Sequence, residues 1–381
     1  MRIVVAPDSF KGSISALGVA QAMRKGALRV FPDAEVVSTP IADGGEGTVE
    51  ALVDATGGEF RISTVTGPLG APVDARWGVL GDKKTAVIEM AAASGLPLLS
   101  GNERNPLLAS TFGTGEVLLK ALDEGLTRII MGIGGSATND GGAGFATALG
   151  VRFLDAGGKV LPQGGAALSR LHSIDASGLD SRLKNVEILV ACDVDNPLCG
   201  PRGASAVFGP QKGATPDMVA ELDAALAHFG SVAQSATGRD IMQVAGSGAA
   251  GGLGAGLLFF TPAQLKPGIT IVLDTLHFES LLQGASFVIT GEGHSDFQTA
   301  YGKAPVGVAH IAKQYGLPVF CLSGGLGRGY QDMYAQGIDA ACPCPPGPMS
   351  LDDAISAGAD LVVDATERLC RTIKAAWNIK H

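Results

Sequence analysis

Short apolar runs that break abruptly into glycine-rich polar loops recur along this chain of 381 residues. The clearest run covers residues 128–133 and leads into the loop Gly134-Gly-Ser-Ala-Thr-Asn-Asp140, after which small and apolar residues return through residue 149. A short run of branched apolar residues predicts a buried strand, and the segment after the loop predicts a helix. The glycines between them leave backbone N–H groups open to a ligand.

Five further transitions of the same kind are present. They lead from residues 3–7 into 8–11, from 36–42 into 43–48, from 188–191 into 192–196, from 287–290 into 291–296, and from 319–322 into 323–325. Open α/β sheets bind ligands beyond the carboxyl ends of their strands, so these loops together predict one shared ligand cleft. The alternative is that the glycines only make tight turns and the acids only cap helices. That alternative weakens as the loops multiply.

The spacing of apolar residues also predicts helices and their order. Helices are expected over residues 13–30, 48–56, 114–124, 215–233 and 351–377. Strands and helices that alternate in this way predict βαβ units on a parallel sheet. The chain is therefore expected to be an α/β protein.

The middle of the chain has a different pattern of apolar and small residues from its two ends. Residues 63–90 contain alternating apolar positions that predict mixed sheet, and residues 246–256 predict a small-residue loop. Because strands and helices are predicted to alternate at both ends, we expect one α/β domain of residues 1–65 and 285–381. A second α/β domain of residues 66–284 is then inserted into it.

Composition narrows the functional classes. Hydrophobic residues make up 46% of the chain, so a large core can be buried, while a net charge of -9 argues against a nucleic-acid surface. No apolar run is long enough to span a bilayer, and no export leader precedes the first strand. The six cysteines lack the paired spacing of a zinc site and are expected to be reduced thiols. These features predict a cytoplasmic protein with no membrane or nucleic-acid partner.

Known nucleotide-binding motifs fit poorly. The P-loop pattern is absent, since Gly302-Lys303 is followed by Ala304 rather than a hydroxyl residue. Residues 132–137 and 246–251 satisfy the dinucleotide pattern loosely, and the first follows a predicted strand. Asp140 would then lie close to a pyrophosphate, which costs binding unless a cation intervenes. An NAD-dependent oxidoreductase is therefore a weaker hypothesis that stays open.

Phosphoryl transfer accounts for more of the residues at once. It needs cationic and N–H groups on the phosphates, hard oxygen ligands for Mg²⁺, and a base near the acceptor hydroxyl. Lysines in or beside glycine-containing loops and carboxylates at predicted strand ends supply these groups: Lys11, Lys212, Lys303, Asp43, Glu46, Asp140, Asp193, Asp195, Glu292 and Asp296. Singly, each is better explained as a surface charge or a helix cap. The combination favours a kinase.

Several of these segments form long, ordered motifs. They are Asp8-Ser-Phe-Lys11, Ala42-Asp-Gly-Gly-Glu-Gly-Thr48, residues 132–142, residues 191–200, Phe208-Gly-Pro-Gln-Lys-Gly-Ala214 and Thr290-Gly-Glu-Gly293. In this order they resemble the signature blocks of type I bacterial glycerate kinases. The resemblance implies ATP-dependent phosphorylation of D-glycerate on its 2-hydroxyl. It also implies a discontinuous Rossmann-like domain, an inserted mixed α/β domain, and an active site in the cleft between them. One departure is His294, where the family has an arginine.

Residue roles follow from the chemistry that such a kinase needs. Asp193 is predicted to be the base, and Lys11 is predicted to be catalytic as well as substrate-binding. The other predicted glycerate ligands are Ser9, Asp43, Gly44 and Gly45. The predicted nucleotide ligands are Gly134, Gly135, Ser136, Asn139, Asp140, Lys212 and Lys303, and the predicted Mg²⁺ ligands are Glu292 and Asp296.

The expected partners are D-glycerate and ATP, in a monomer or homo-oligomer. Besides the oxidoreductase, a non-enzymatic protein that binds a small hydroxy acid is the remaining alternative.

Overall fold

The computed structural model describes residues 1–379, which form two compact units. The first unit contains residues 1–43, 50–57 and those from 269 onward, and the second contains residues 44–49 and 58–268. The predicted α/β class is confirmed, because one unit has a parallel sheet and the other a mixed sheet. The domain boundaries expected at residues 65 and 285 stay a prediction. No helix in the described part of the chain is both long and apolar enough to cross a membrane.

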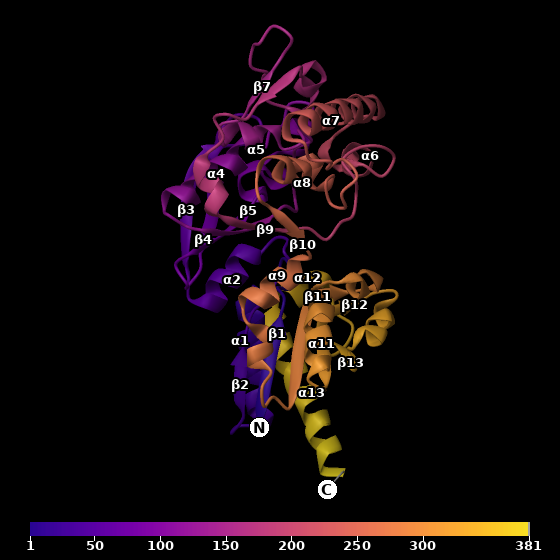
Figure 1. The fold of residues 1–381 in the computed structure, drawn as a ribbon. Helices are drawn as coiled ribbons and strands as arrows, with labels where there is room; N and C mark the ends of the chain where they lie inside the picture. Colours follow the sequence, from indigo (N-terminus) through magenta and orange to yellow (C-terminus); the bar gives the residue numbers. More distant parts are fainter. Residues whose placement is uncertain (380–381) are drawn as a thin grey trace. The chain divides into compact units, whose positions relative to one another are not determined.

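The first unit is built on a parallel sheet with the strand order β13-β12-β11-β1-β2 (Figure 1). Its strands are β1 (Arg2–Pro7), β2 (Glu35–Ser38), β11 (Phe287–Ser295), β12 (Val319–Leu326) and β13 (Ala340–Pro343). Its helices are α1 (Ala16–Val30), α9 (Gly268–Thr275), α10 (Phe278–Leu281), α11 (Ala304–Gln314), α12 (Leu351–Ser356) and α13 (Gly358–Ile379), with 3₁₀ turns at Phe297–Tyr301 and Tyr330–Gln336. Helix α2 (Thr48–Thr56) is divided between the units: residues 48 and 49 belong to the second unit, and the rest of the helix belongs to the first.

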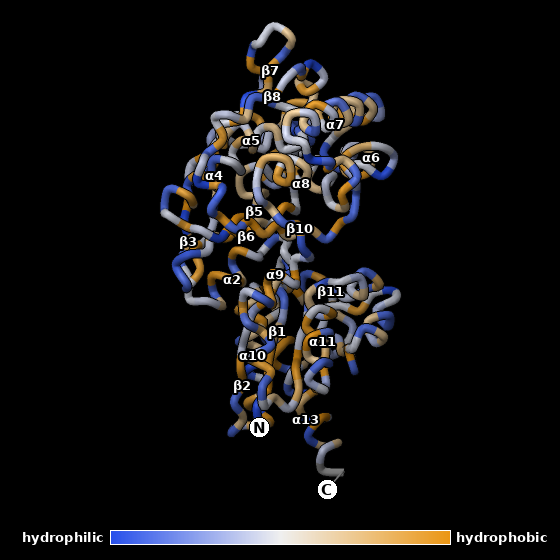
Figure 2. Tube along the Cα trace, viewed as in Figure 1, coloured by the Kyte–Doolittle hydropathy of each residue, from blue (hydrophilic) through white to orange (hydrophobic). Residues whose placement is uncertain are grey.

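Helices cover both faces of this sheet. Helices α1 and α13 pack on one face around a core that contains Ile3, Val5 and Ile289, and α11 packs against β11 and β12 from the other. Because successive side chains of a strand point to opposite faces, strands buried on both sides are apolar throughout. Figure 2 shows this hydrophobic colouring along β1. The sheet is therefore a rigid support for the loops at its strand ends.

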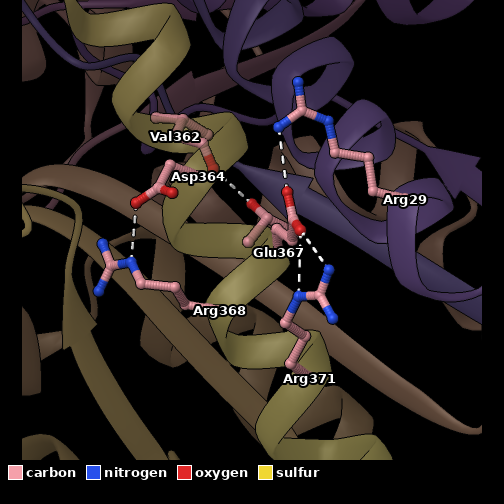
Figure 3. A network of polar contacts seen from close by, with 7 residues as sticks. Arg29, Val362, Asp364, Glu367, Arg368 and Arg371 are labelled. Carbon is pink, nitrogen blue, oxygen red and sulfur yellow. Dashed lines mark hydrogen bonds and ion pairs between the residues drawn. The ribbon is translucent and has the colours of Figure 1, made fainter.

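Helices α1 and α13 approach each other closely at Gly26. A Cβ atom at this position would lie 2.4 Å from the carbonyl oxygen of Val363 and 2.7 Å from the Cβ of Thr366. Beside this contact, Arg29 of α1 donates to Glu367 of α13, and Arg371 donates to the same carboxylate (Figure 3). These exposed ion pairs contribute little compared with the packing of the two helices.

We expect Gly26→Ala to destabilise the protein by about 1–3 kcal/mol, because the new methyl group must push apart two packed helices. The helix propensity of alanine offsets only about 1 kcal/mol of this loss. Urea unfolding measures the change. The control is Gly18→Ala in the same helix, where a Cβ atom has its nearest neighbour at 3.5 Å and should stabilise slightly. Equal effects of the two substitutions would show that the close approach has no energetic cost.

The second unit contains a six-stranded mixed sheet with the order β10-β9-β6-β5-β4-β3. Its strands are β3 (Glu59–Thr66), β4 (Pro72–Val79), β5 (Thr85–Glu89), β6 (Arg128–Gly132), β9 (Glu187–Ala191) and β10 (Gln264–Lys266), with a separate pair β7 (Arg152–Leu154) and β8 (Ser173–Asp175). Its helices are α3 (Ala91–Ser94), α4 (Phe112–Asp123), α5 (Ala143–Ala148), α6 (Ala204–Phe208), α7 (Pro216–Thr237) and α8 (Ala249–Phe260). Short 3₁₀ turns lie at Leu96–Leu98, Gly101–Glu103, Gly165–Arg170, Ser181–Asn185 and Pro210–Lys212. Strands β5, β6, β9 and β10 are parallel, so their carboxyl ends share one edge.

Four element predictions were wrong in detail. Residues 246–256, predicted as a loop, lie largely in α8, although residues 250–252 have left-handed backbone angles. The strand predicted to reach residue 42 ends at Ser38. The terminal helix is two helices, α12 and α13. Strands β11 and β12 pair beyond residues 291 and 323, so glycines read as a loop lie inside strands.

Candidate active site

A pocket of about 480 Å³ lies at the carboxyl ends of the strands of the first unit. The chain leaves β1 toward β2 on one side, whereas β11 leads to β12 and β13 on the other. Such a switch point opens a crevice between neighbouring strand ends, where open α/β sheets bind ligands. Besides Ser13, the polar residues that line the pocket are Asp8, Ser9, Lys11, Asp43, Glu292, His294 and Lys303. Sequence analysis had predicted ligand or metal roles for five of them, all except Asp8 and His294.

One wall of this pocket is apolar. Pro345, Leu351, Ile355 and Leu361 line it, and the side chain of Leu351 is exposed. The pocket therefore combines a charged floor with a hydrophobic side, a common property of sites for small organic anions and nucleotides.

Asp8 is a carboxylate of this pocket to which sequence analysis assigned no role. It is 8% exposed, its backbone N–H donates to the carbonyl of Gly291, and its Oδ1 accepts the N–H of Ser9 at 2.6 Å. The pKa of Asp8 is raised to about 7, chiefly by burial and then by the nearby Asp43, while the N–H of Ser9 and the charge of Lys11 oppose this shift. A carboxyl group with this pKa can exchange a proton near neutral pH.

Glu292 faces the same pocket but is held by hydroxyl groups. Its Oε1 accepts hydrogen bonds from Ser295 at 2.8 Å and Thr299 at 2.7 Å. Burial raises the pKa of Glu292, whereas those two hydroxyl groups lower it. The carboxylate therefore has a fixed orientation, which suits a ligand-positioning or metal-binding role.

Asp296 and Lys303 form a neighbouring pair. The Oδ1 of Asp296 accepts the N–H of Gln298, which caps a 3₁₀ turn, and lies 3.8 Å from the ammonium of Lys303. No group of three or more His, Cys, Asp or Glu side chains within residues 1–379 has the geometry of a metal site. Mg²⁺ commonly takes only one or two carboxylates together with substrate phosphates. The assignment of Glu292 and Asp296 as its ligands fits that pattern and stays a prediction.

The second unit presents the loop from residue 134 to 140 at the carboxyl end of β6. Gly134 and Gly135 are exposed, whereas the five residues that follow are buried. A Cβ atom at Gly134 would lie 3.9 Å from Gly45, so the predicted nucleotide loop and the predicted substrate loop approach each other in this unit. Within residues 134–140, the two glycines are therefore the exposed part of the loop.

The carboxylate of Asp140 organises this loop from inside. It accepts hydrogen bonds from the backbone N–H groups of Thr111, Gly142 and Gly144 and from the hydroxyl of Thr111, at 2.8–3.2 Å. Burial raises the pKa of Asp140 against the effect of these donors. The carboxylate already accepts four hydrogen bonds within the unit and is buried, so the predicted contact between Asp140 and phosphate would have to be indirect.

Lys212 is also buried, with 1% exposure. Its ammonium donates to the hydroxyl of Ser136 at 2.8 Å and to the carbonyl of Thr138 at 2.6 Å. Burial lowers the pKa of Lys212 to about 7, and Asp140 attracts the charged form. Asn139, also buried, donates to Ser205. The predicted phosphate role of Lys212 and Asn139 remains untested, but both side chains already have partners inside the unit.

Gly44 can only be glycine, since a Cβ atom there would lie 2.6 Å from the Cβ of Ala191. This contact seats the loop after residue 43 on the end of β9. Glu89 at the end of β5 accepts the N–H of Val49 at 2.9 Å and also those of Gly47 and Thr48. Glu89, a residue that sequence analysis did not identify, therefore holds the segment that directly follows the predicted glycerate ligands Asp43, Gly44 and Gly45.

Asp193 is exposed and lies just beyond β9. Its Oδ1 accepts the N–H of Gly268 at 2.9 Å. This is the capping contact that was the alternative explanation for such aspartates. Its role as the base stays a prediction.

A model of the glycerate kinase family matches residues 3–374. The chain belongs to the glycerate kinase family. Among its relatives, a glycerate kinase of Bacillus subtilis is 54% identical over 99% of this chain and 98% of its own length. A glycerate 2-kinase of Escherichia coli is 51% identical over 98% of both chains. The structure is also similar to that of a Salmonella typhimurium LT2 protein provisionally assigned as glycerate kinase 2, with a TM-score of 0.91, 49% identity and 99% coverage of each chain.

Membership of this family confirms the resemblance seen in the motifs and the predicted enzyme class, a kinase. It favours a phosphotransferase over the oxidoreductase and the non-enzymatic binding protein. The departure at His294 lies in the pocket of the first unit, where its side chain is exposed.

Proposed function

We propose that this protein transfers the γ-phosphoryl group of ATP to the 2-hydroxyl of D-glycerate, giving 2-phosphoglycerate and ADP. The observation that carries the proposal is the similarity along nearly the whole chain to relatives named glycerate kinase, one of them glycerate 2-kinase. Both substrates are small water-soluble anions, which agrees with the expected cytoplasmic location and with the absence of a predicted nucleic-acid or membrane partner.

The pocket of the first unit has the groups that a small hydroxy acid requires. Lys11 lines this pocket, is exposed, and is suited to pair with the glycerate carboxylate. Ser9, two positions earlier in the sequence, lines the same pocket. Lys303 provides a second cation for phosphate oxygens. In the second unit, the exposed Gly134 and Gly135 are suited to contact phosphate through main-chain N–H groups. Mg²⁺, when bound, would neutralise charge that develops on the phosphoryl group.

The proposal is tested by coupling ADP release to an absorbance change in the presence of ATP, Mg²⁺ and a panel of hydroxy acids. D-Glycerate should give the highest kcat/KM, and phosphorus NMR should show one product phosphorylated at the 2-position. ADP release that does not depend on glycerate, or a 3-phosphorylated product, would contradict the proposal. A glycerate-dependent absorbance change with NAD and no ATP would instead support the oxidoreductase.

Replacing Lys11 by methionine should raise the KM for glycerate at least about tenfold, because a charge-assisted contact to a carboxylate contributes about 1.5–3 kcal/mol. Steady-state kinetics with glycerate varied at saturating ATP measure the change. Lys25→Met, an exposed lysine on α1, is the matched control and should behave like the unmodified enzyme. An unchanged KM in Lys11→Met would remove Lys11 from the substrate site.

A further inference from the structure

The carboxylate of Asp8 is held in a way that leaves one oxygen for a ligand. Oδ1 accepts the N–H of Ser9, and no other hydrogen bond reaches this carboxylate from the described residues. The backbone of Asp8 is itself fixed, since its N–H donates to Gly291 on the neighbouring strand. Oδ1 therefore has a partner within the loop, and Oδ2 is the oxygen that remains for a substrate.

The surroundings of Asp8 match those of an acceptor site. The charged groups that face it are Asp43 beyond β2, Lys11 in its own loop, and Glu292 at the end of β11. Lys303 and His294 also line this pocket. A small hydroxy acid whose carboxylate pairs with Lys11 would therefore place its hydroxyl group among these carboxylates.

We propose that Asp8, rather than Asp193, is the carboxylate that orients the acceptor hydroxyl and takes its proton. The inference rests on the proposed function. The hydroxyl oxygen forms a bond to the γ-phosphorus while the bond from that phosphorus to the β,γ-bridging oxygen breaks. The hydroxyl proton passes to Asp8, and ADP leaves with the bonding electron pair. The raised pKa of Asp8 agrees with this role but does not define it.

Two observations separate Asp8 from Glu292 and Asp193. One oxygen of Glu292 accepts hydrogen bonds from two hydroxyl groups, and these contacts fix the orientation of its carboxylate. Asp193 is exposed and accepts a main-chain N–H, which places it in a cap. Asp8 combines near-complete burial, a fixed backbone and an oxygen directed to no donor in the described structure.

The test compares Asp8→Asn, Asp8→Glu, Asp193→Asn and the exposed control Asp33→Asn in the full-length enzyme. Asparagine retains an oxygen for the N–H of Ser9, so Asp8→Asn should fold and keep its melting temperature. Its kcat should fall about 100-fold or more, which is typical of a lost general base, while the KM for glycerate stays within about threefold. Asp8→Glu should recover part of the kcat. Asp33→Asn should retain its kcat, and Asp193→Asn should lose less of its kcat than Asp8→Asn.

Several results would overturn the proposal. One is an Asp8→Asn variant that keeps more than about a fifth of the kcat. Another is an effect confined to the KM, and a third is recovery of activity on raising Mg²⁺ tenfold, which would make Asp8 a metal ligand. Loss of turnover in Asp193→Asn alone would restore the sequence-based prediction. If the unmodified enzyme releases no ADP with glycerate, the proposed function fails first, and the two failures are thereby distinguished.

Discussion

Replacing Asp140 by alanine is expected to lower the free energy of unfolding of the protein by about 3–5 kcal/mol. The substitution removes the acceptor of four hydrogen bonds, three of them from main-chain N–H groups that are buried with it. Buried donors without partners each cost about 1–3 kcal/mol. In addition, Lys212 loses a nearby carboxylate that favours its charged form.

Urea unfolding followed by circular dichroism measures this effect, and Asp155→Ala is the matched control. Asp155 also accepts two main-chain N–H groups, from Gly157 and Lys159, but at an exposed turn where water can replace it. Its substitution should cost about 1 kcal/mol or less. Asp140→Asn should lie between the two alanine variants, because one of its two polar atoms becomes a donor. A loss below about 1 kcal/mol in Asp140→Ala would show that the loop after β6 does not depend on this carboxylate.

The strands that carry the candidate site could be predicted because their apolar runs are short, branched and bounded by glycine. Strands β1, β6 and β9 end within about a residue of the predicted positions. Helix α8 was missed because its sequence is rich in glycine, which disfavours helices, and its residues are held by burial in the second unit. Likewise, β11 continues through Gly291 and Gly293 because β12 pairs with it over that length. These elements depend on tertiary contacts that local sequence does not contain.

Residue roles were harder to predict than residue positions. The glycine-rich loops indicated which segments lie at the strand ends where ligands bind. They did not indicate which side chains there can contact a ligand. Lys212 and Asp140 were both predicted to bind the nucleotide, yet both are buried and hydrogen-bonded within the second unit. Asp8 begins one of the recognised motifs but received no role in the sequence analysis, and an aspartate directly after a strand is most often a turn residue. Only the fold shows that its second oxygen has no donor beside it.

The stability of this enzyme is expected to rise with pH between about 7 and 9 through Lys212. Burial lowers the pKa of this lysine to about 7 in the folded protein, against an ordinary value of 10.5. Between these values the unfolded chain binds more protons than the folded one, so the free energy of unfolding increases with pH. Each unit of pH across this window contributes about 1.4 kcal/mol at most. Below about pH 7 the lysine is charged in both states and adds no pH dependence.

The measurement is the difference in unfolding free energy between the unmodified protein and Lys212→Met at pH 7, 8 and 9. That difference should shift by on the order of 2 kcal/mol in favour of the unmodified protein as the pH rises. The window stops at pH 9 because burial raises the pKa of Cys321 and Cys344 to about 12, which adds an opposite slope above the ordinary thiol pKa. Lys25→Met should give no such shift, since this lysine is exposed in the folded protein. A difference for Lys212→Met that stays constant with pH would mean that the ammonium remains charged inside the loop, with Asp140 as its counter-ion.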